Sequence, residues 1–239
     1  MPAYNAADTI VQAIDSVVDQ TYPDWELIVV NDGSSDSTSE IVRQKYGLES
    51  RIKLVENDPN RGVAQSRNIA TDLSSGEYIA FLDCDDWWEP SKLEEQVALM
   101  ETTGSKCCHS YYRRVSGETG DTLSVVRAPA LVTLQDMYLT NQIGNLTGIY
   151  HARTLGKFFQ KEVRHEDYAM WLSVLRTTNS VCSPKVLANY RIKADSLSGN
   201  KIKSLTWHFA RLRNELDLSL LSAIYYTIAH VVIVISRRR

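Results

Sequence analysis

Short apolar runs alternate with amphipathic stretches along the first part of the chain. Apolar runs rich in β-branched and aromatic residues, bounded by turn-forming residues, predict buried strands at 25–30, 52–55 and 78–82. Apolar residues at helical spacing, among them Ile10 and Ile14, predict a helix over 7–19. Further helices are predicted at 37–46, around 64–70 and at 90–103.

Strands that alternate with helices predict an α/β fold, in which helices cover the faces of a parallel sheet. In such sheets a ligand binds outside the carboxyl ends of the strands. Asp32, Asn57 and Asp83 each stand at the carboxyl end of a predicted strand. We therefore expect these three polar residues to converge on one edge of the sheet.

The regular alternation ends beyond Gly104, where we predict a strand at 106–114, a hairpin at 116–121, a helix at 134–139 and a strand at 146–150. Another helix is predicted to begin with Glu166 and Asp167. Acidic residues in a first turn stabilise the helix dipole. The residues alone therefore slightly favour this structural role over a catalytic one, with His165 as a surface or capping residue.

Three carboxylates, those of Asp83, Asp85 and Asp86, follow the predicted strand 78–82. Carboxylates so close together repel one another, and each resists ionising beside the others. A divalent cation or a hydroxyl-rich ligand among them would make the arrangement favourable. The alternative is a polar turn before a helix, but three acids followed by two tryptophans favour a binding site.

Composition narrows the possible functions of this 239-residue chain. The net charge of −3 gives no support for nucleic-acid binding through a bulk basic surface. The four cysteines show no C-x-x-C pairing and the chain opens with no secretory signal, so we expect reduced thiols and a cytoplasmic location. Neither a G-x-G-x-x-G fingerprint nor a phosphate loop occurs, so a bound diphosphate would need a metal held by the three aspartates.

The last part of the chain predicts two helices. Residues 201–216 carry apolar side chains on one face and basic ones around it, which suits either a membrane interface or packing on the rest of the protein. Residues 218–235 are strongly apolar and precede Arg237-Arg238-Arg239. Polar residues within this short stretch favour a helix lying on the inner leaflet over a membrane span, with the arginines at anionic headgroups. Packing in a homodimer is the alternative.

Five motifs, taken in order, resemble those of family 2 glycosyltransferases. Three resemble that family's nucleotide-binding motifs, namely Pro2-Ala3-Tyr4-Asn5, the stretch 29–36 (VVNDGSSD) and the stretch 60–68 (NRGVAQSRN). The stretch 81–86 (FLDCDD) resembles the D-x-D element, and His165-Glu166-Asp167-Tyr168 resembles the E-D motif on the acceptor side. The resemblance extends from residue 1 to about residue 198. It is greatest to bacterial enzymes of capsule, teichuronic acid or exopolysaccharide assembly.

The resemblance implies a GT-A fold, a Rossmann-like and mostly parallel sheet flanked by helices. It implies a catalytic domain over 1–198, with a nucleotide-binding half at 1–103 and an acceptor half at 104–198, followed by a helical tail at 199–239. The implied reaction is inverting transfer of a sugar from a nucleoside diphosphate donor, normally a UDP-sugar, with Mg²⁺ or Mn²⁺. The acceptor would be a hydroxyl of a glycan or a polyprenyl-linked glycan at the inner face of the cell membrane.

The resemblance also implies roles for individual residues. Asp32 would bind the base, Ala3 and Tyr4 would line the base pocket, and Arg67 would approach the base or the diphosphate. Asp167 would be the catalytic base, with Glu166 as its orienter or as the second candidate. The donor-binding set comprises Ala3, Tyr4, Asn5, Asp32, Gly62, Arg67 and Asp83, and the metal would be held by Asp85 and Asp86. Asp83 and Asp85 would share contacts with the ribose and the metal.

The chain departs from the family pattern at its start, because relatives begin one strand earlier, with apolar residues that run into Pro2. That strand is central in the GT-A sheet, and Met1 occupies its last position. A sheet without it would leave unpaired backbone groups and exposed apolar helix faces. We therefore expect an Ile/Val-rich strand to be encoded upstream of Met1.

Two other functions remain open at this point. A metal-dependent phosphohydrolase would use Asp83 as its nucleophile, but Trp87 stands where that chemistry usually has a small residue, and the motif comes late in the chain. A non-catalytic module that binds a sugar nucleotide or a glycan would not need a base. The presence of both Asp85 and Asp167 argues against such a module.

Overall fold

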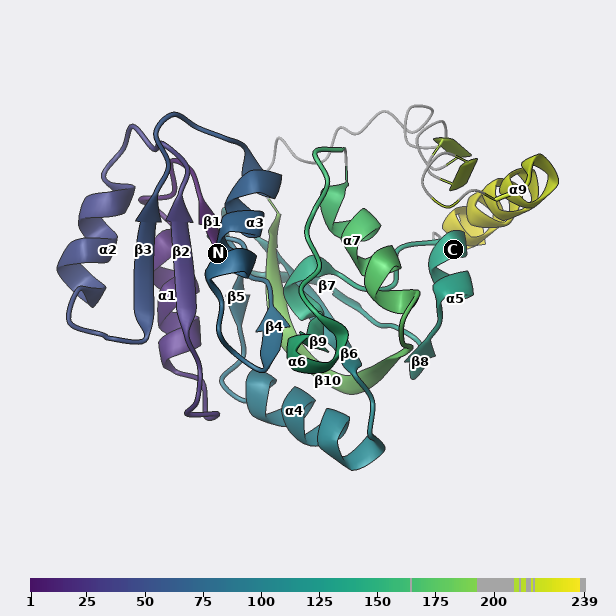
Figure 1. Cartoon of the computed structure of the whole chain (residues 1–239), viewed down its shortest axis with the longest axis horizontal. Helices are drawn as coiled ribbons and strands as arrows, with labels where there is room; N and C mark the ends of the chain where they lie inside the picture. The colour runs from purple at the N-terminus through teal and green to yellow at the C-terminus, as the bar shows by residue number, and fades with distance from the viewer. Residues whose placement is uncertain (164, 193–208, 211, 214–215, 217, 237–239) are drawn as a thin grey trace.

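A computed structural model describes residues 1–163, 165–192, 209–210, 212–213, 216 and 218–236 (Figure 1). The first part of the chain forms a three-stranded parallel sheet in the order β1-β2-β3. Its strands are β1 (Pro2–Ala3), β2 (Leu27–Asn31) and β3 (Ile52–Glu56), and the helices that connect them are α1 (Ile10–Val18) and α2 (Thr38–Tyr46). These elements confirm the predicted α/β alternation.

A second, mixed sheet follows, in the order β4-β9-β6-β10-β5, with β7 on β6 and β8 on β10. Its strands are β4 (Tyr78–Ala80), β5 (Trp87–Trp88), β6 (Cys107–Ser116), β7 (Thr122–Val126), β8 (Leu131–Val132), β9 (Ile149–His151) and β10 (Ser180–Ile192). Only β6 and β10 pair in parallel, whereas the other pairs are antiparallel. The expected continuous parallel sheet is therefore divided in two, because β1 contains only two residues and does not link β2 to β4.

The remaining helices surround the second sheet. They are α3 (Val63–Leu73), α4 (Lys92–Thr103), α5 (Leu134–Leu139), α6 (Ala152–Leu155), α7 (Glu166–Leu175) and α9 (Leu220–Ser236), with a 3₁₀ helix at Asn145–Thr147. The predicted bounds of α5 and the predicted start of α7 are confirmed. The bounds predicted for α1 to α4 and α9 shift by up to three residues, and α6 was not predicted. The strand predicted at 146–150 is confirmed only at its end, because β9 begins at Ile149 and the residues before Gly148 form the 3₁₀ turn.

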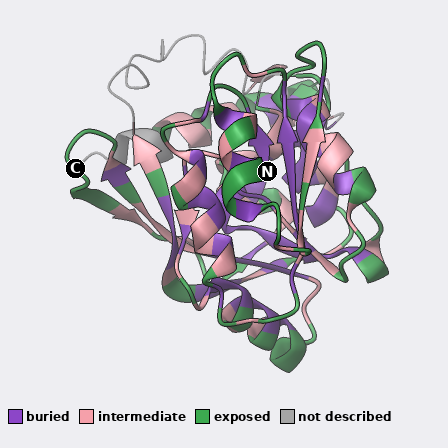
Figure 2. Cartoon of the chain, turned by 90° about the vertical axis from the view of Figure 1, so that its left-hand side faces the viewer, coloured by how far each residue is buried: buried purple, intermediate pink, exposed green. Residues whose placement is uncertain are grey.

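Two hydrophobic clusters form the core, and Figure 2 shows the buried residues gathered on the inner strands and helix faces. The first cluster lies between α1, β2 and α4, where Ile10 and Ile14 are fully buried. The second surrounds α7, whose Trp171 is fully buried and packs edge-on against Phe81 and Tyr150. This packing fixes the first turn of α7, which carries Glu166 and Asp167, relative to β4 and β9.

The helix α9 lies at the end of the molecule opposite α2 (Figure 1). It packs on α5, where the rings of Tyr138 and Tyr226 are 5.2 Å apart and the Nδ1 atom of His230 lies 2.7 Å from the carbonyl oxygen of Leu139. Among the described helices, none is both long enough and apolar enough to cross a membrane. Most of the helix predicted at 201–216, and the domain boundary near 198, fall outside the described residues.

Candidate functional site

Asp32 follows β2 and holds a loop at the carboxyl edge of the first sheet. Its carboxylate accepts hydrogen bonds from the side-chain amide of Asn57 at 2.8 Å and from the backbone amides of Arg61 at 2.9 Å and Gly62 at 2.8 Å. Burial raises the pKa of Asp32, but hydrogen bonds from Arg61, Asn57, Ser66 and Gly62 outweigh it and lower the pKa overall. The expected convergence of Asp32 and Asn57 is confirmed.

The segment after β1 is attached to the loop that follows β2. The backbone amide of Asn5 donates to the Ser34 hydroxyl at 2.9 Å, and the Asn5 side-chain oxygen accepts from the Ser35 amide at 2.9 Å. Ala3 is in register with Asn31 of β2 and is buried. Tyr4, which lies between Ala3 and Asn5 in the chain, is largely exposed, and an exposed aromatic face can stack on a planar base.

Arg67 of α3 is a buried cation that joins two carboxylates from distant parts of the chain. Its guanidinium donates to Asp83 at 2.7 Å and to Glu166 at 2.8 Å. Burial lowers the pKa of Arg67, but Asp83, Glu166 and Asp167 outweigh it and raise the pKa overall, so Arg67 keeps its charge. The structure thus brings together Arg67, Asp83 and Glu166, which the sequence assigned to separate motifs.

Gln160 is a further contact of Arg67, and no sequence motif predicted it. It is buried, and its side-chain oxygen accepts a hydrogen bond from the Arg67 guanidinium at 3.0 Å. Two further hydrogen bonds, at 2.7 and 2.8 Å, tie the Gln160 backbone to the side chain of Asn68. A neutral amide in a segment without periodicity carries no signal, so only the folded chain shows that it positions Arg67.

The acidic stretch after β4 is in contact with Arg191 of β10, a residue that no sequence motif indicated. Asp86 is buried and its carboxylate accepts a hydrogen bond from the Arg191 backbone amide at 2.9 Å. Burial and the nearby charges of Asp83 and Asp85 raise the pKa of Asp86 to about 8. The Arg191 guanidinium donates to the Asp85 carbonyl at 2.8 Å and lies 4.9 Å from the centre of the Trp87 ring.

These carboxylates fit a divalent cation that is shared with a ligand. In the described part of the chain, no three His, Cys, Asp or Glu side chains form a group able to hold a metal alone. Mg²⁺ in nucleotide sites usually takes one or two carboxylates, and substrate phosphates and water supply the rest. Asp83 is bound to Arg67 and Asp86 is buried, whereas Asp85 is half-buried. The role of Asp85 and Asp86 as metal ligands therefore stays a prediction.

Asp167 lies in the first turn of α7, beside the Arg67 cluster. Burial raises the pKa of Asp167, and a hydrogen bond from the Tyr168 amide and the charge of Arg67 offset this only in part. A carboxylate with a raised pKa is a better general base than an exposed one. A negative charge in the first turn also interacts favourably with the helix dipole. The structural role and the catalytic role predicted for Asp167 are therefore compatible.

Comparisons with known proteins identify the family of the chain. The family model for glycosyl transferase family 2 matches residues 1–160. An Escherichia coli UDP-Glc:alpha-D-GlcNAc-diphosphoundecaprenol beta-1,3-glucosyltransferase is 35% identical over 239 residues, which cover 99% of this chain and 92% of the relative.

Two solved structures show the same fold. TarS of S. aureus in complex with UDP-GlcNAc matches with a TM-score of 0.73 at 21% identity, over 96% of this chain and 70% of TarS. A mannosyltransferase of Pyrobaculum calidifontis in complex with GDP-Man and Mn²⁺ matches with a TM-score of 0.64 at 20% identity, over 98% of this chain and 73% of that protein. The expected GT-A fold is confirmed by these matches. The family model and the E. coli relative show that the chain is a glycosyltransferase that belongs to family 2.

Proposed function

We propose that the protein transfers a hexose from a UDP-sugar to a hydroxyl of a polyprenyl diphosphate-linked glycan, with inversion, during bacterial surface polysaccharide synthesis. The E. coli relative, by its name, uses UDP-Glc and a lipid-linked GlcNAc acceptor and forms a beta linkage. The observation that carries the proposal is the bridge from Arg67 to Asp83 after β4 and to Glu166 at the start of α7. It joins the proposed donor side to the proposed acceptor side.

The donor lies along the carboxyl edge of the first sheet in this proposal. Tyr4 stacks on the base, and Asp32 binds the base. The Asp32 carboxylate also holds the loop in place through the backbone amides of Arg61 and Gly62. Arg67 neutralises charge next to the diphosphate and holds Asp83. The donor-side set is Ala3, Tyr4, Asn5, Asp32, Gly62, Arg67 and Asp83, as the family motifs imply.

The acceptor reacts at the first turn of α7. Asp167 takes the proton from the acceptor hydroxyl while the hydroxyl oxygen attacks the anomeric carbon of the donor sugar. The bond from that carbon to the diphosphate oxygen breaks, and UDP leaves. Glu166, fixed by Arg67, orients the acceptor. A divalent cation near Asp85, with Asp86 as the second predicted ligand, would stabilise the negative charge on the leaving diphosphate.

Replacing the proposed base tests this function. Asp167→Asn should reduce transfer from UDP-Glc to a GlcNAc-diphospholipid about 10²–10⁴-fold, because a positioned base contributes that much. UDP binding, measured by calorimetry in Mn²⁺, should remain within about twofold of the parent, because Asp167 does not touch the donor in this proposal. Asp121→Asn, in the exposed turn between β6 and β7, is the control.

The outcomes separate the possible functions. Transfer by Asp167→Asn at the parent rate would show that Asp167 is not the base. A parent chain that binds UDP but transfers no sugar from any UDP-sugar would instead support the non-catalytic binding module. Hydrolysis of phosphate esters that is lost in Asp83→Asn would support the phosphohydrolase.

We also propose that the catalytic domain spans 1–198 and that the tail at 199–239 attaches it to the membrane surface on the cytoplasmic side. The outer face of α9 supports this, because its large apolar side chains recur at helical spacing and are exposed. They are Leu221, Ile224, Tyr225, Ile228 and Val232. A helix of this kind binds at the boundary between headgroups and acyl chains, where a polyprenyl-linked acceptor is presented. A homodimer formed through the same face is the competing arrangement.

A further inference from the structure

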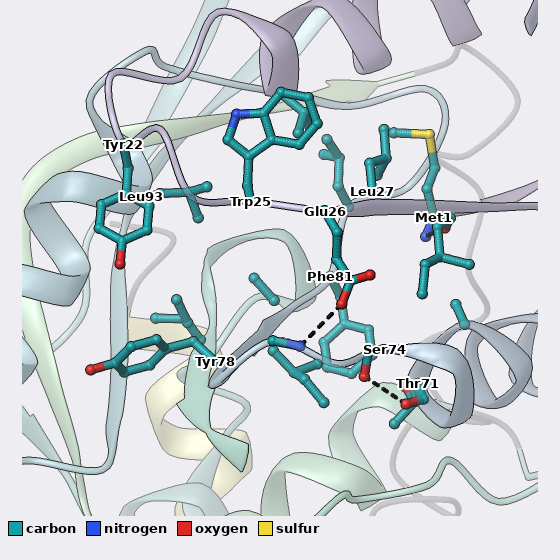
Figure 3. A pocket seen from close by; sticks show the side chains of 18 of the residues that line it. Met1, Tyr22, Trp25, Glu26, Leu27, Thr71, Ser74, Tyr78, Phe81 and Leu93 are labelled. Atoms are coloured by element: carbon teal, nitrogen blue, oxygen red, sulfur yellow. Dashed lines mark hydrogen bonds between the residues drawn. The ribbon is translucent and has the colours of Figure 1, made fainter. Parts of the chain in front are cut away.

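A surface hollow of about 380 Å³ lies between α1 and β5. It differs in character from the cleft of about 430 Å³ between the two sheets, where Figure 3 shows Trp25 and Leu27 facing Tyr78 and Phe81. The walls of that cleft are mainly apolar, whereas the hollow at α1 combines aromatic and polar walls. Its volume falls within the range of about 300–1,000 Å³ that is typical of small-molecule sites.

One wall of the hollow is aromatic. Trp87 and Trp88 of β5 form it, together with Pro90. Trp88 is buried, and its indole N–H donates to the Leu146 carbonyl at 2.9 Å. Trp87 is only half-buried, and its indole N–H makes no hydrogen bond within the described residues. This wall therefore offers an apolar surface and a free donor, the combination with which tryptophan binds amphipathic ligands.

The opposite wall is one flank of α1, where two polar side chains are already engaged. Asp15 accepts hydrogen bonds from the Lys45 ammonium at 2.7 Å and from the Tyr46 hydroxyl at 2.7 Å. The side-chain oxygen of Gln12 accepts from the Arg191 guanidinium. Only the amide N–H groups of the Gln12 side chain therefore remain for a ligand.

Asp19, directly after α1, contributes a free carboxylate to the same wall. It is exposed, and its carboxylate makes no hydrogen bond or ion pair in the part of the chain that the structure describes. Asp19 is the C-cap of α1, where a negative charge meets the negative end of the helix dipole. Asp15 lies four positions earlier, and like charges at this spacing repel. A carboxylate that is unfavourable for its own helix fits a ligand contact better than a structural role.

The free polar groups determine which class of ligand fits. The Asp19 carboxylate accepts hydrogen bonds, whereas the Gln12 amide and the Trp87 indole donate them. A hydroxyl group both donates and accepts, so a ring that carries several hydroxyls can satisfy all three side chains. A cation would meet two donors, and an anion would meet the carboxylates. A pyranose combines its hydroxyls with an apolar C–H face, which suits the aromatic wall.

The hollow lies beside the proposed transfer site without being part of it. The Arg191 guanidinium contacts Gln12 in the wall of the hollow and donates to the Asp85 carbonyl at 2.8 Å. None of the residues assigned to the donor, the metal or the catalytic base lines the hollow. A ligand in the hollow therefore leaves the proposed transfer site open.

We propose that the hollow between α1 and β5 is a second carbohydrate site, which binds one pyranose unit of a neutral glycan. The apolar face of the pyranose packs on Trp87 and Pro90. Its hydroxyls donate to the Asp19 carboxylate and accept from the Gln12 amide and the Trp87 indole N–H. The site holds a glycan next to the proposed transfer site and takes no part in the chemistry.

The test follows the indole N–H resonance of Trp87 in the isotope-labelled full chain, identified by its loss in Trp87→Phe. Methyl β-D-glucopyranoside or methyl N-acetyl-β-D-glucosaminide should shift this resonance in a saturable way. Asp19→Ala should weaken the apparent affinity at least about tenfold, because a hydrogen bond to a charged group is lost. Asp72→Ala removes an exposed carboxylate in the last turn of α3 and should leave the affinity within about twofold of the parent. Neither measurement depends on sugar transfer, so the result is independent of the proposed function.

The other outcomes would each overturn the second site. A shift that is kept in Asp19→Ala and lost in Asp167→Asn would place the sugar in the proposed transfer site. A resonance that responds to choline and to neither glycoside would show that the hollow binds cations. A resonance that responds to none of these probes would show that the hollow binds no sugar, and it would leave the proposed transfer reaction unaffected.

Discussion

At the residue scale, substitution of Arg67 removes several contacts of the proposed site at once. It is buried and contacts Asp83, Glu166 and Gln160, so its removal leaves two carboxylates and an amide without their partner. Lysine could not replace it, because a single ammonium cannot span two carboxylates as a planar guanidinium does. The acidic groups around Arg67 therefore depend on this one cation.

We expect Arg67→Met to lower the free energy of unfolding by about 2 kcal/mol, less than for a fully buried pair because both carboxylates are partly exposed to solvent. Transfer should fall as well, because Asp83 and Glu166 lose their orientation. Urea unfolding and initial-rate kinetics measure the two effects. Arg43→Met removes an exposed pair with Glu56 and should change stability by less than about 0.5 kcal/mol. Equal effects of the two substitutions would contradict the role given to Arg67.

The pH dependence of transfer should report the raised pKa of Asp167. The base works only when deprotonated, so transfer falls as the pH drops through this pKa, tenfold per unit below it. Because burial raises the pKa, the midpoint should lie above about 3.9, the ordinary value for an aspartate. Measurements of kcat/KM between pH 4 and 8, with UDP binding followed over the same range as a control, give this midpoint. Transfer that stays constant down to pH 4 would argue against Asp167 as the base.

At the scale of elements, the turn before β9 and the helix α7 are in direct contact at Gly148. This glycine has an ordinary negative φ of −78°, so it is required by space and not by its backbone conformation. A Cβ atom at this position would lie 2.3 Å from the Trp171 ring, far inside van der Waals contact. The close approach determines how α7, with Asp167 in its first turn, lies against the sheet.

We expect Gly148→Ala to destabilise the protein by about 3 kcal/mol, at the upper end of the range for overpacked cores. Transfer should fall further than stability alone explains, because Trp171 can yield only by shifting α7. Gly144→Ala is the matched control, because its Cβ would meet its neighbours no closer than 3.4 Å. Thermal unfolding together with transfer below the unfolding temperature measures both effects. If the two alanine variants behave alike, this contact does not position α7.

Sequence patterns anticipated some elements better than others. The hydrophobic periodicity of α1 predicted that helix, because α1 covers the core with one face. The long strand β10 was missed, because it lies against β6 and carries both buried and exposed residues without strict alternation. Irregularities in the pairing of β10 with β6 between Ser183 and Ala188 remove the period that would have marked it.

At the scale of the whole molecule, the end helix α9 carries large apolar side chains on its exposed face. Its inner face packs on α5, and Ala223 is fully buried there, whereas Leu221, Ile228 and Val232 are more than half exposed. A contiguous apolar stripe of this kind on an exposed helix face is typical of a surface that binds a membrane or another protein.

We expect the double substitution Leu221→Asp and Ile228→Asp to release the protein from membranes, because it places charge where acyl chains would lie. Flotation with vesicles of anionic and neutral lipids measures binding, and the parent chain should float with the anionic vesicles. The control Leu48→Asp changes a fully exposed leucine that follows α2, at the opposite end of the molecule (Figure 1). A parent chain that stays unbound and forms dimers, which the double substitution dissolves, would support the dimer arrangement instead.

The sequence by itself determined the α/β class and the residue types of the site. Hydrophobic periodicity and the order of the motifs depend only on residues close together in the chain. Both can therefore be recognised in the sequence without the folded structure. Tertiary structure alone decided the contacts of Arg67 with Asp83, Gln160 and Glu166, since these residues are up to 99 positions apart. It also decided the division into two sheets, because strand pairing is a long-range property that no local pattern encodes.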